Sequence, residues 1–572
     1  MKQIPHYRLR RIFVLSVFAL GLGILFVRAV DLQLFNHEFL EEEGKARHLR
    51  VVEIPTHRGM ILDRNGQLLA VSTPVHSVWA NPAEALDDRE SVVRAEKILE
   101  MKAGELASKL EQKKKRQFLY VKRHVGPQYA EELNQADLSG IYLQREYRRY
   151  YPTAEVSSHV LGFTNIDDKG LEGIELAYED WLVSKPGAKR VIKDQLNRIV
   201  EDVEAVRIPR PGRNVELSID RRVQYLAYRE LKAGYIQHGA QSASAVMIDA
   251  KTGEVIAMVN VPSFNPNNRK GYKQSTYRNR AVTDVFEPGS TMKPFVIALA
   301  LESKRYFLDT VIDTTPGTYK IGRYKIRDVR DFGPLSVNDV LLKSSNVGAV
   351  KIALTIPRPD LWNLYNAIGV GQSTESGFPG EVHGHLKYHR DWHHTEHATL
   401  AFGYGMSTTT LQLARAYTVL ASNGRQLSIS MLRKADAGER WQTSPRVVSS
   451  QTVKQVRSIL NAVVSEYGTG FRAAIPGYHV AGKTGTVHKL AGGEYAKDKY
   501  ISLFAGMAPA SDPRLVLVVV VNEPSRGVYF GGQVAAPIFS SIMGGALRIL
   551  NIAPDNVPVR TDIAHLSKDH AG

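Results

Sequence analysis

An uncharged run near the amino end constrains the fold of this chain more than any other feature. Residues 12–27 carry no charged side chain. Four basic residues precede the run: Lys2, Arg8, Arg10 and Arg11. The run is somewhat shorter than the roughly 20 residues that cross a bilayer, but Arg28 can reach the interface and let the span extend. Because basic residues before a span face the cytoplasm, we expect a cytoplasmic tail at 1–11 and a transmembrane anchor at 12–32.

A cleaved signal peptide is the main alternative for this segment. Its apolar region is usually about 7–15 residues and ends at a small-x-small cleavage site. Here the run is followed by Arg28-Ala29-Val30-Asp31, and the chain has no cysteine that could carry a lipid. A buried core helix is a third alternative, which the basic flank at the terminus argues against. The sequence therefore favours a retained anchor that leaves the rest of the chain outside the inner membrane, in the periplasm.

The length of 572 residues is too great for one hydrophobic core and indicates several domains. The run Pro209-Arg210-Pro211-Gly212 punctuates the chain and marks a plausible boundary. We therefore expect one domain at 33–210 and a second at 211–557. The polar tail at 558–572 is predicted to be disordered.

Alternating and periodic apolar patterns in the second domain predict both strands and helices. Strands are expected at 214–219, 244–249, 254–259, 501–507 and 514–521, and helices at 221–234, 410–422 and 453–465. The run at 514–521 is nearly unbroken valine and leucine, as in a strand buried on both faces. Strands at both ends with helices between them predict an α+β domain in which helices flank an antiparallel sheet.

The first motif with chemical content is Ser290-Thr291-Met292-Lys293, the only place where a serine stands three residues before a lysine. Helix formers follow it, so Ser290 should lie at a helix start with Lys293 one turn later on the same face. A serine hydroxyl is a weak nucleophile until a neighbouring base removes its proton. Lysine can be that base only if burial or a second positive charge lowers its pKa.

Two further motifs follow in a fixed order: Ser344-Ser345-Asn346, and then Lys483-Thr484-Gly485-Thr486. Ser344 could relay a proton to a leaving amine, and the Asn346 amide could bind a peptide backbone. Alone, however, such a triplet is more often a helix cap or a turn.

The third motif resembles a short strand. Lys483 and the hydroxyls of Thr484 and Thr486 could bind a carboxylate, and Gly485 would admit a substrate close to the strand. The same three letters occur at Lys251-Thr252-Gly253, which we interpret as the tip of a hairpin without a catalytic role. The ordered set of motifs is typical of enzymes that acylate a serine.

Composition excludes some chemistry and leaves other partners open. The absence of cysteine excludes thiol catalysis and thiolate metal sites. The net charge of +16 fits a solvated basic surface or an anionic neighbour such as a membrane or a wall polymer. No nucleic-acid-binding motif is present. His393, His394 and His397 lie near Asp391, but no further ligand is identifiable, so we expect no metal and no cofactor.

With these motifs the chain resembles the class B penicillin-binding proteins, which are peptidoglycan DD-transpeptidases, and among them the division-specific (FtsI-type) branch. The resemblance covers nearly the whole chain. It includes the anchor and the stretches at 58–66, 173–175, 286–294, 343–348 and 482–486. The elongation branch typically has Asp where this chain has Asn346, which favours division.

The resemblance implies an elongated pedestal domain of the dimerisation type at 33–210 and a penicillin-binding transpeptidase domain, similar to serine β-lactamases, at 211–557. It implies Ser290 as the acylated nucleophile, surrounded by Lys293, Ser344, Asn346, Lys483, Thr484, Gly485 and Thr486. The implied substrate is the D-Ala-D-Ala stem peptide of peptidoglycan, and β-lactams would mimic it. The implied partners are a glycan polymerase and other division membrane proteins.

Several alternatives stay open at this stage. A DD-carboxypeptidase would pass the acyl group to water instead of an amine, and the motifs do not decide between the two acceptors. A β-lactamase would leave the anchor and the pedestal without a purpose. A division scaffold or a β-lactam sensor would not need turnover. Glu179-Asp180 is the nearest match to a glycosyltransferase motif, but no His-x-Gly follows, so we expect no such activity.

Overall fold

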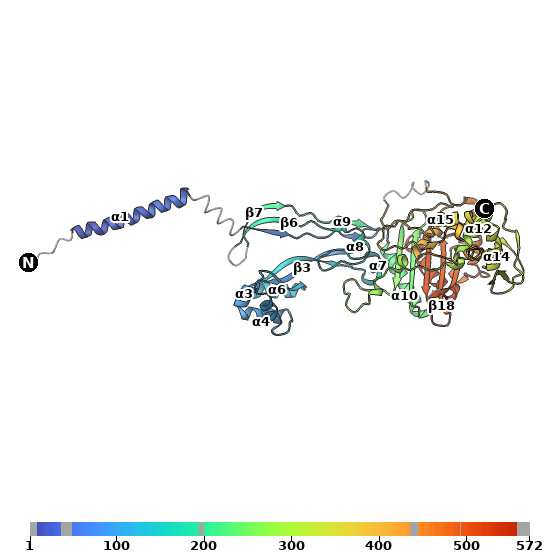
Figure 1. Ribbon diagram of the computed structural model, residues 1–572, viewed down its shortest axis with the longest axis horizontal. Helices are drawn as coiled ribbons and strands as arrows, with labels where there is room; N and C mark the ends of the chain where they lie inside the picture. The colour runs from blue at the N-terminus through green and yellow to red at the C-terminus, as the bar shows by residue number, and fades with distance from the viewer. Residues whose placement is uncertain (1–7, 36–48, 194–198, 435–443, 492–493, 557–572) are drawn as a thin grey trace, which may run out of the picture. The chain divides into compact units, whose positions relative to one another are not determined.

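The computed structural model describes residues 8–35, 49–193, 199–434, 444–491 and 494–556 (Figure 1). Part of the predicted cytoplasmic tail and the whole of the predicted tail at 558–572 lie outside these residues. The chain forms two compact units. Unit 1 comprises Met1–His57, Val75–Tyr147 and Ser184–Gly212, and unit 2 comprises Arg58–Pro74, Arg148–Val183 and Arg213–Gly572. The boundaries predicted at 33–210 and 211–557 stay predictions, because both units are assembled from separated segments.

The amino-terminal apolar run forms the helix α1, Arg8–Val30, followed by a short wider turn at Asp31–Phe35 (Figure 1). Its apolar side chains are exposed along the whole helix, with Phe13 70% and Phe26 71% accessible. Within the described residues this is the one helix long and apolar enough to cross a membrane. Apolar side chains that no described residue covers are expected of a membrane-spanning helix.

Unit 1 contains an antiparallel sheet and a helical cluster. The sheet has the order β1-β6-β7 and joins Leu49–Ile54, Gly187–Lys193 and Ile199–Arg207. The helices are α3 Pro82–Asp87, α4 Arg89–Ile98, α5 Glu105–Gln112 and α6 Pro127–Ala136. Three strands accompany them, β3 Leu68–Ala80, β4 Leu119–Val125 and β5 Ile141–Tyr150, of which β3 and β5 run on into unit 2. Val78, Leu99 and Leu106 form the buried centre of the cluster.

The central sheet of unit 2 has five antiparallel strands in the order β10-β9-β19-β18-β17. They are β9 Ser242–Asp249, β10 Val255–Val261, β17 Ala481–Ala491, β18 Glu494–Ala508 and β19 Leu515–Asn522. The hairpin of β9 and β10 holds Lys251-Thr252-Gly253 at its turn, as predicted. The predicted antiparallel sheet and its buried valine-rich strand are confirmed.

Helices cover both faces of this sheet, and strand β19 shows how. Leu517 and Val519 belong to one hydrophobic cluster with α10, Arg221–His238, and α19, Gly531–Ile549. Val518 belongs to a second cluster with α12, Lys293–Glu302, and α17, Thr410–Ala421. Because successive side chains of a strand point to opposite faces, a continuous apolar run serves two cores at once.

Unit 2 contains further described α-helices and β-strands, which are 2 to 14 residues long. The helices are α7 Ser158–Leu161, α8 Gly173–Ala177, α9 Glu179–Leu182, α11 Arg280–Thr283, α13 Val337–Leu342, α14 Asn346–Leu354, α15 Arg358–Ala367, α16 His394–Leu400 and α18 Ser450–Val463. The strands are β2 Ile61–Leu62, β8 Val215–Glu216, β11 Val311–Asp313, β12 Thr318–Ile321, β13 Tyr324–Arg327, β14 Pro334–Ser336, β15 His385–Leu386 and β16 Met406–Ser407. The strand predicted at 214–219 is therefore limited to β8, because the chain turns at Asp220 to cap α10.

Two early segments of the chain are built into unit 2. Strand β2 pairs in parallel with β8, and Gly59 lies so close to Arg213 that an added Cβ would stand 1.9 Å from its carbonyl oxygen. Glu175 is fully buried and accepts a hydrogen bond of 2.7 Å from the Nε of both Arg58 and Arg149. The glycine-containing stretch at 170–175 therefore contributes a carboxylate to a buried ion pair.

Candidate active site

Ser290 lies in a tight turn, Gly289–Met292, that leads directly into α12. Gly289 has a φ of +57°, which a glycine adopts without steric cost. Its N–H donates to the Gly403 carbonyl at 3.1 Å, and a Cβ on Gly403 would stand 2.2 Å from the Gly289 oxygen. The buried Tyr417 hydroxyl donates to the Thr291 carbonyl at 2.8 Å. The half-buried Ser290 thus occupies a turn whose backbone is fixed on both sides.

Lys293 is the first residue of α12, and its side chain is fully buried. Its ammonium group donates to the Ser344 carbonyl at 2.5 Å, to the Ser344 hydroxyl at 3.2 Å and to Asn346 Oδ1 at 2.7 Å. Burial lowers the pKa of Lys293 well below its usual value, and the charge of Lys483 lowers it further, while Asp328 opposes both effects. The condition set by the sequence for a lysine base, burial beside a second cation, is met.

The Ser344 hydroxyl is where the first and third motifs meet. It accepts from Lys293 Nζ at 3.2 Å and from Lys483 Nζ at 2.9 Å. Ser344 has a φ of +59°, a left-handed conformation that is costly for a residue with a Cβ. This strained backbone directs the Ser344 carbonyl and hydroxyl toward the two ammonium groups.

Lys483 lies on β17 and pairs in register with Ala505 of β18. Its side chain is fully buried, and burial lowers its pKa to about 7. Thr484 Oγ1 lies 3.2 Å from Thr469 Oγ1, and Thr486 Oγ1 accepts from the Gly531 N–H at 2.9 Å. Each polar side chain of the third motif therefore contacts a different segment of unit 2: Lys483 contacts Ser344, Thr484 contacts Thr469, and Thr486 contacts Gly531.

Gly485 has an internal reason to be glycine. A Cβ there would stand 2.9 Å from Leu503 Cδ1 and 3.2 Å from Thr291 Cγ2. A side chain would therefore collide with the neighbouring strand and with the turn that carries Ser290. The sequence predicted that Gly485 lets a substrate come close to the strand. The structure shows that Gly485 lets Leu503 and Thr291 pack close to β17.

Four comparisons with known proteins indicate to which family a chain with these motif residues belongs. A model of the penicillin-binding protein transpeptidase domain matches residues 243–544, and a model of the penicillin-binding protein dimerisation domain matches residues 53–217. The chain is 42% identical over 545 residues to the "Peptidoglycan D,D-transpeptidase FtsI" of Escherichia coli, covering 94% of this chain and 91% of that protein. It is 41% identical over 549 residues to the "Probable peptidoglycan D,D-transpeptidase PbpC" of Pseudomonas aeruginosa, covering 96% of both.

The chain belongs to the class B penicillin-binding proteins. Among solved structures, the transpeptidase domain of Burkholderia pseudomallei penicillin-binding protein 3 is similar to it at 44% identity with a TM-score of 0.55. That structure covers 60% of this chain and 98% of its own. The matched transpeptidase model contains all eight residues that the sequence singled out, from Ser290 to Thr486. The predicted family and the predicted two-domain plan are confirmed.

One carboxylate of this class B site was missed by the sequence. Asp328 Oδ1 accepts from the Asn346 N–H at 2.5 Å and from the Val347 N–H at 3.1 Å, and Asp328 Oδ2 accepts from the Ser345 hydroxyl at 2.6 Å. The Ser345 hydroxyl also caps α14 by accepting from Gly348 N–H at 2.9 Å. A negative group at a helix start is favourable, so Asp328 fixes the start of α14, where Ser344 and Asn346 lie.

Glu287 is a second residue to which the sequence assigned no role. It accepts from the Gly405 N–H at 2.8 Å and from the Tyr495 hydroxyl at 3.0 Å, and burial raises its pKa. Its Oε2 atom is buried without a partner among the described residues. The only signal in the sequence was its position three residues before Ser290.

The histidine cluster has a structural explanation. His393 caps α16, and burial lowers the pKa of His397 to about 4 while its ring stacks on Trp392 at 5.9 Å. Within the part of the chain that the structure describes, no group of three or more His, Asp or Glu side chains could hold a metal ion.

Proposed function

We propose that this protein is a serine D-Ala-D-Ala transpeptidase that cross-links peptidoglycan stem peptides at the division septum, and that β-lactams acylate the same serine. The observation that carries the proposal is the shared hydroxyl of Ser344, which is hydrogen-bonded to the buried ammonium groups of both Lys293 and Lys483. That arrangement joins a base to a carboxylate-binding lysine through one exchangeable proton. Membership of the class B penicillin-binding proteins supplies the substrate class.

In the first step, Lys293 acts as the general base. Its lowered pKa makes the neutral amine accessible, so Nζ can take the proton of the Ser290 hydroxyl as Oγ attacks the penultimate D-Ala carbonyl. The backbone N–H groups of Ser290 and Thr486 would bind the negative oxygen that develops. When the C–N bond breaks, Ser344 gives its proton to the amine of the departing D-Ala and recovers one from Lys293.

The carboxylate of the terminal D-Ala would bind at the third motif. Lys483 supplies a positive charge. The Thr486 hydroxyl accepts a hydrogen bond from the Gly531 N–H, so its own proton is left to donate to the carboxylate. Thr484 lies beside it on β17. Asn346 binds the stem peptide through its side-chain amide, and Gly485 leaves the strand free of a side chain between the two threonines. The amine of a neighbouring stem peptide then attacks the acyl-enzyme and releases Ser290.

The proposal also covers where the protein lies in the cell and which proteins it works with. Helix α1 would hold the protein in the inner membrane, with residues 33–557 in the periplasm. The FtsI name of its relatives and the amide at Asn346 support a septal role, with a glycan polymerase and other division membrane proteins as partners. The boundary at residue 210 between the pedestal and the transpeptidase domain belongs to the same proposal.

Covalent labelling with a fluorescent penicillin tests the nucleophile. We expect the wild-type protein to be labelled and Ser290→Ala to be unlabelled. Ser303→Ala is the matched control, because Ser303 is an exposed serine just beyond the end of the same helix. Labelling that persisted in Ser290→Ala would refute the assignment.

Product analysis tests the acceptor. Lipid-linked precursor, a partner polymerase and the full-length protein should yield cross-linked stem peptides. Release of D-Ala and tetrapeptide without dimers would assign a carboxypeptidase instead. Depletion in cells should block septation, whereas an intact septum with rounded cells would indicate elongation.

A further inference from the structure

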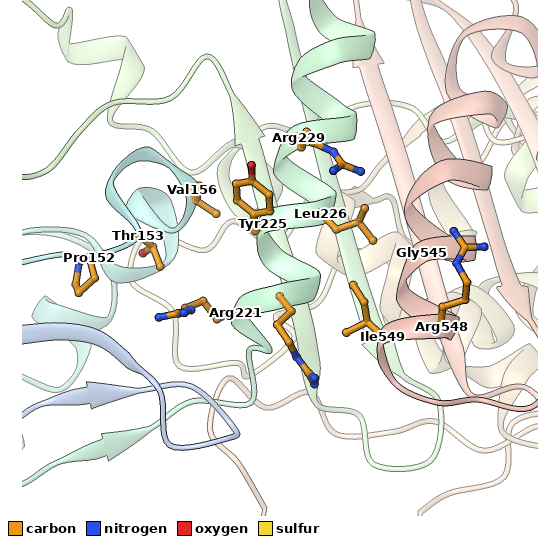
Figure 2. Close-up of a pocket in the computed structure, with 11 residues that line it drawn as sticks. Pro152, Thr153, Val156, Arg221, Tyr225, Leu226, Arg229, Gly545, Arg548 and Ile549 are labelled. Atoms are coloured by element: carbon orange, nitrogen blue, oxygen red, sulfur yellow. The ribbon is translucent and has the colours of Figure 1, made fainter.

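A pocket of about 780 Å³ lies beside α10 and α19, and none of its lining residues belongs to the three motifs (Figure 2). Four arginines line it: Arg221, Arg222, Arg229 and Arg548. No aspartate or glutamate is among the lining residues. The pocket therefore presents concentrated positive charge that plays no part in the proposed reaction.

Two of these arginines have partners outside the pocket. Arg222 pairs with Asp220 at 2.8 Å, and Arg229 pairs with its neighbour Glu230 at 2.6 Å, although both guanidinium side chains stay more than half exposed. In the described part of the chain, the guanidinium groups of Arg221 and Arg548 contact no acceptor. The pocket therefore has two arginines without an acidic partner, Arg221 and Arg548. The other two, Arg222 and Arg229, are paired but remain exposed to solvent.

The floor of the pocket is apolar and rigid. Leu226 of α10 and Ile549 of α19 form its centre, and Tyr225 is 56% exposed at its edge. The two helices pack so closely at Gly545 that an added Cβ would stand 2.5 Å from Leu226 Cδ2. Exposed tyrosine and arginine around an apolar centre are the residue types that dominate binding energy in protein interfaces.

The arrangement of the charges selects the ligand. Figure 2 shows Arg229 and Arg548 beside Leu226 and Ile549, whereas the side chain of Arg221 extends to the opposite side, near Thr153, so the guanidinium groups do not gather on one point. A single phosphate needs several donors that converge on it. An extended peptide with acidic side chains on both sides of an apolar one matches cations that surround an apolar floor. The volume falls within the roughly 300–1,000 Å³ of ligand-sized sites, which suits a few residues and not a folded domain.

We propose that this pocket, the α10–α19 pocket, binds a short segment of a partner protein in which acidic residues flank a leucine or an aromatic residue. The acids pair with Arg221 and Arg548, and the apolar side chain packs on Leu226 and Ile549. Nothing in this proposal depends on the chemistry of Ser290.

A random peptide library tests the proposal. Twelve-residue peptides displayed on phage are selected on the full-length protein in detergent, and the Arg221→Ala/Arg548→Ala double variant is selected in parallel. We expect the wild-type protein to enrich peptides with acids on both sides of Leu, Phe or Trp, and the double variant to lose that enrichment. The best peptide, resynthesised with a fluorophore, should bind at least about tenfold more weakly to the double variant, and its affinity should fall with added salt.

The matched control is Arg305→Ala/Arg433→Ala, which removes the same charge from exposed positions that do not line the pocket and should leave binding unchanged. Penicillin labelling of every variant confirms that unit 2 is folded. Enrichment without acids, or equal binding by the double variant, would overturn the proposal. Displacement of the peptide by inorganic pyrophosphate at equal concentration would assign a phosphate site. Arginine-dependent binding to phosphatidylglycerol vesicles without any peptide binding would assign a lipid surface.

Discussion

Replacement of Asp328 by asparagine should slow acylation while leaving the fold intact. The carboxylate accepts three hydrogen bonds at the start of α14, from the Asn346 N–H, the Val347 N–H and the Ser345 hydroxyl. Hydrogen bonds to a charged acceptor contribute about 1.5–3 kcal/mol each, against about 0.5–1.5 kcal/mol for neutral pairs. Loss of the charge therefore weakens the anchoring of the second motif by about 3–4.5 kcal/mol in all.

If about half of that loss appears as misalignment of Ser344 and Asn346, the acylation rate should fall about 10- to 40-fold, since about 1.4 kcal/mol corresponds to a factor of ten. A second readout comes from pH. The negative charge of Asp328 raises the pKa of Lys293. Its removal lowers that pKa, so the acidic limb of the pH–rate profile should move to lower pH.

The assay is the second-order rate constant for labelling by a fluorescent penicillin, measured across the pH range with the full-length protein. Asp331→Asn is the control, because Asp331 is an exposed carboxylate in the same loop whose Oδ1 accepts from the Gly333 N–H at 2.9 Å. Asp331→Asn should acylate at the wild-type rate. A wild-type rate for Asp328→Asn, or an acidic limb that moved to higher pH, would refute the reasoning.

Three further substitutions test other parts of the molecule. Lys483→Met should abolish penicillin labelling yet stabilise the protein by about 1–3 kcal/mol at neutral pH, because it removes a buried cation. Since the pKa of Lys483 is about 7 when folded and higher when unfolded, wild-type stability rises with pH above 7 and the gap should narrow there. Glu175→Gln should destabilise unit 2 by about 3–5 kcal/mol in chemical unfolding, because it removes the buried carboxylate shared by Arg149 and Arg58 and leaves Arg58 paired with Glu179 alone. Gly403→Ala should lose most penicillin labelling, whereas Gly377→Ala, at a similar positive φ but in open space, should keep it.

Each of these expectations has a contrary result. A Lys483→Met protein less stable than wild type at neutral pH would contradict the cost assigned to burial. Glu172→Gln is the control for Glu175, since Glu172 is exposed and should change stability by less than about 0.5 kcal/mol. Equal losses of stability in Glu175→Gln and Glu172→Gln would show that the buried ion pair does not contribute specifically to stability. Equal labelling of the two glycine variants would show that the contact of Gly403 with the nucleophile turn is unimportant.

The sequence predicted those parts of the site that depend on local pattern. The helix after Ser290, the hairpin at 251–253 and the buried strand β19 follow from spacing and apolar runs of a few residues. The lowered pKa of Lys293 could be anticipated because a lysine base requires it. Each of these conclusions needs only neighbours in the chain and general chemistry.

The rest depends on contacts between distant segments. Asp328 lies well before the second motif in the chain, in a loop without periodicity, and nothing in its neighbours marks it as the partner of Asn346. The left-handed conformation of Ser344 is set by the packing around it and not by a residue type that favours positive φ. The division into units was also out of reach, because the pairing of Arg58 with Glu175 joins two segments that local patterns treat separately.

The parallel pairing of β2 with β8 has a consequence for how the chain is made. Val215 leaves the ribosome about 150 residues after its partner Ile61. At the usual speed of synthesis, about 5–20 residues per second, strand β2 waits roughly 10–30 s for the strand that completes it. Arg58 waits for Glu175 during much of the same interval. Strand β2 can therefore pair early with β3 on one edge, but its other edge has to be kept from wrong partners until β8 arrives.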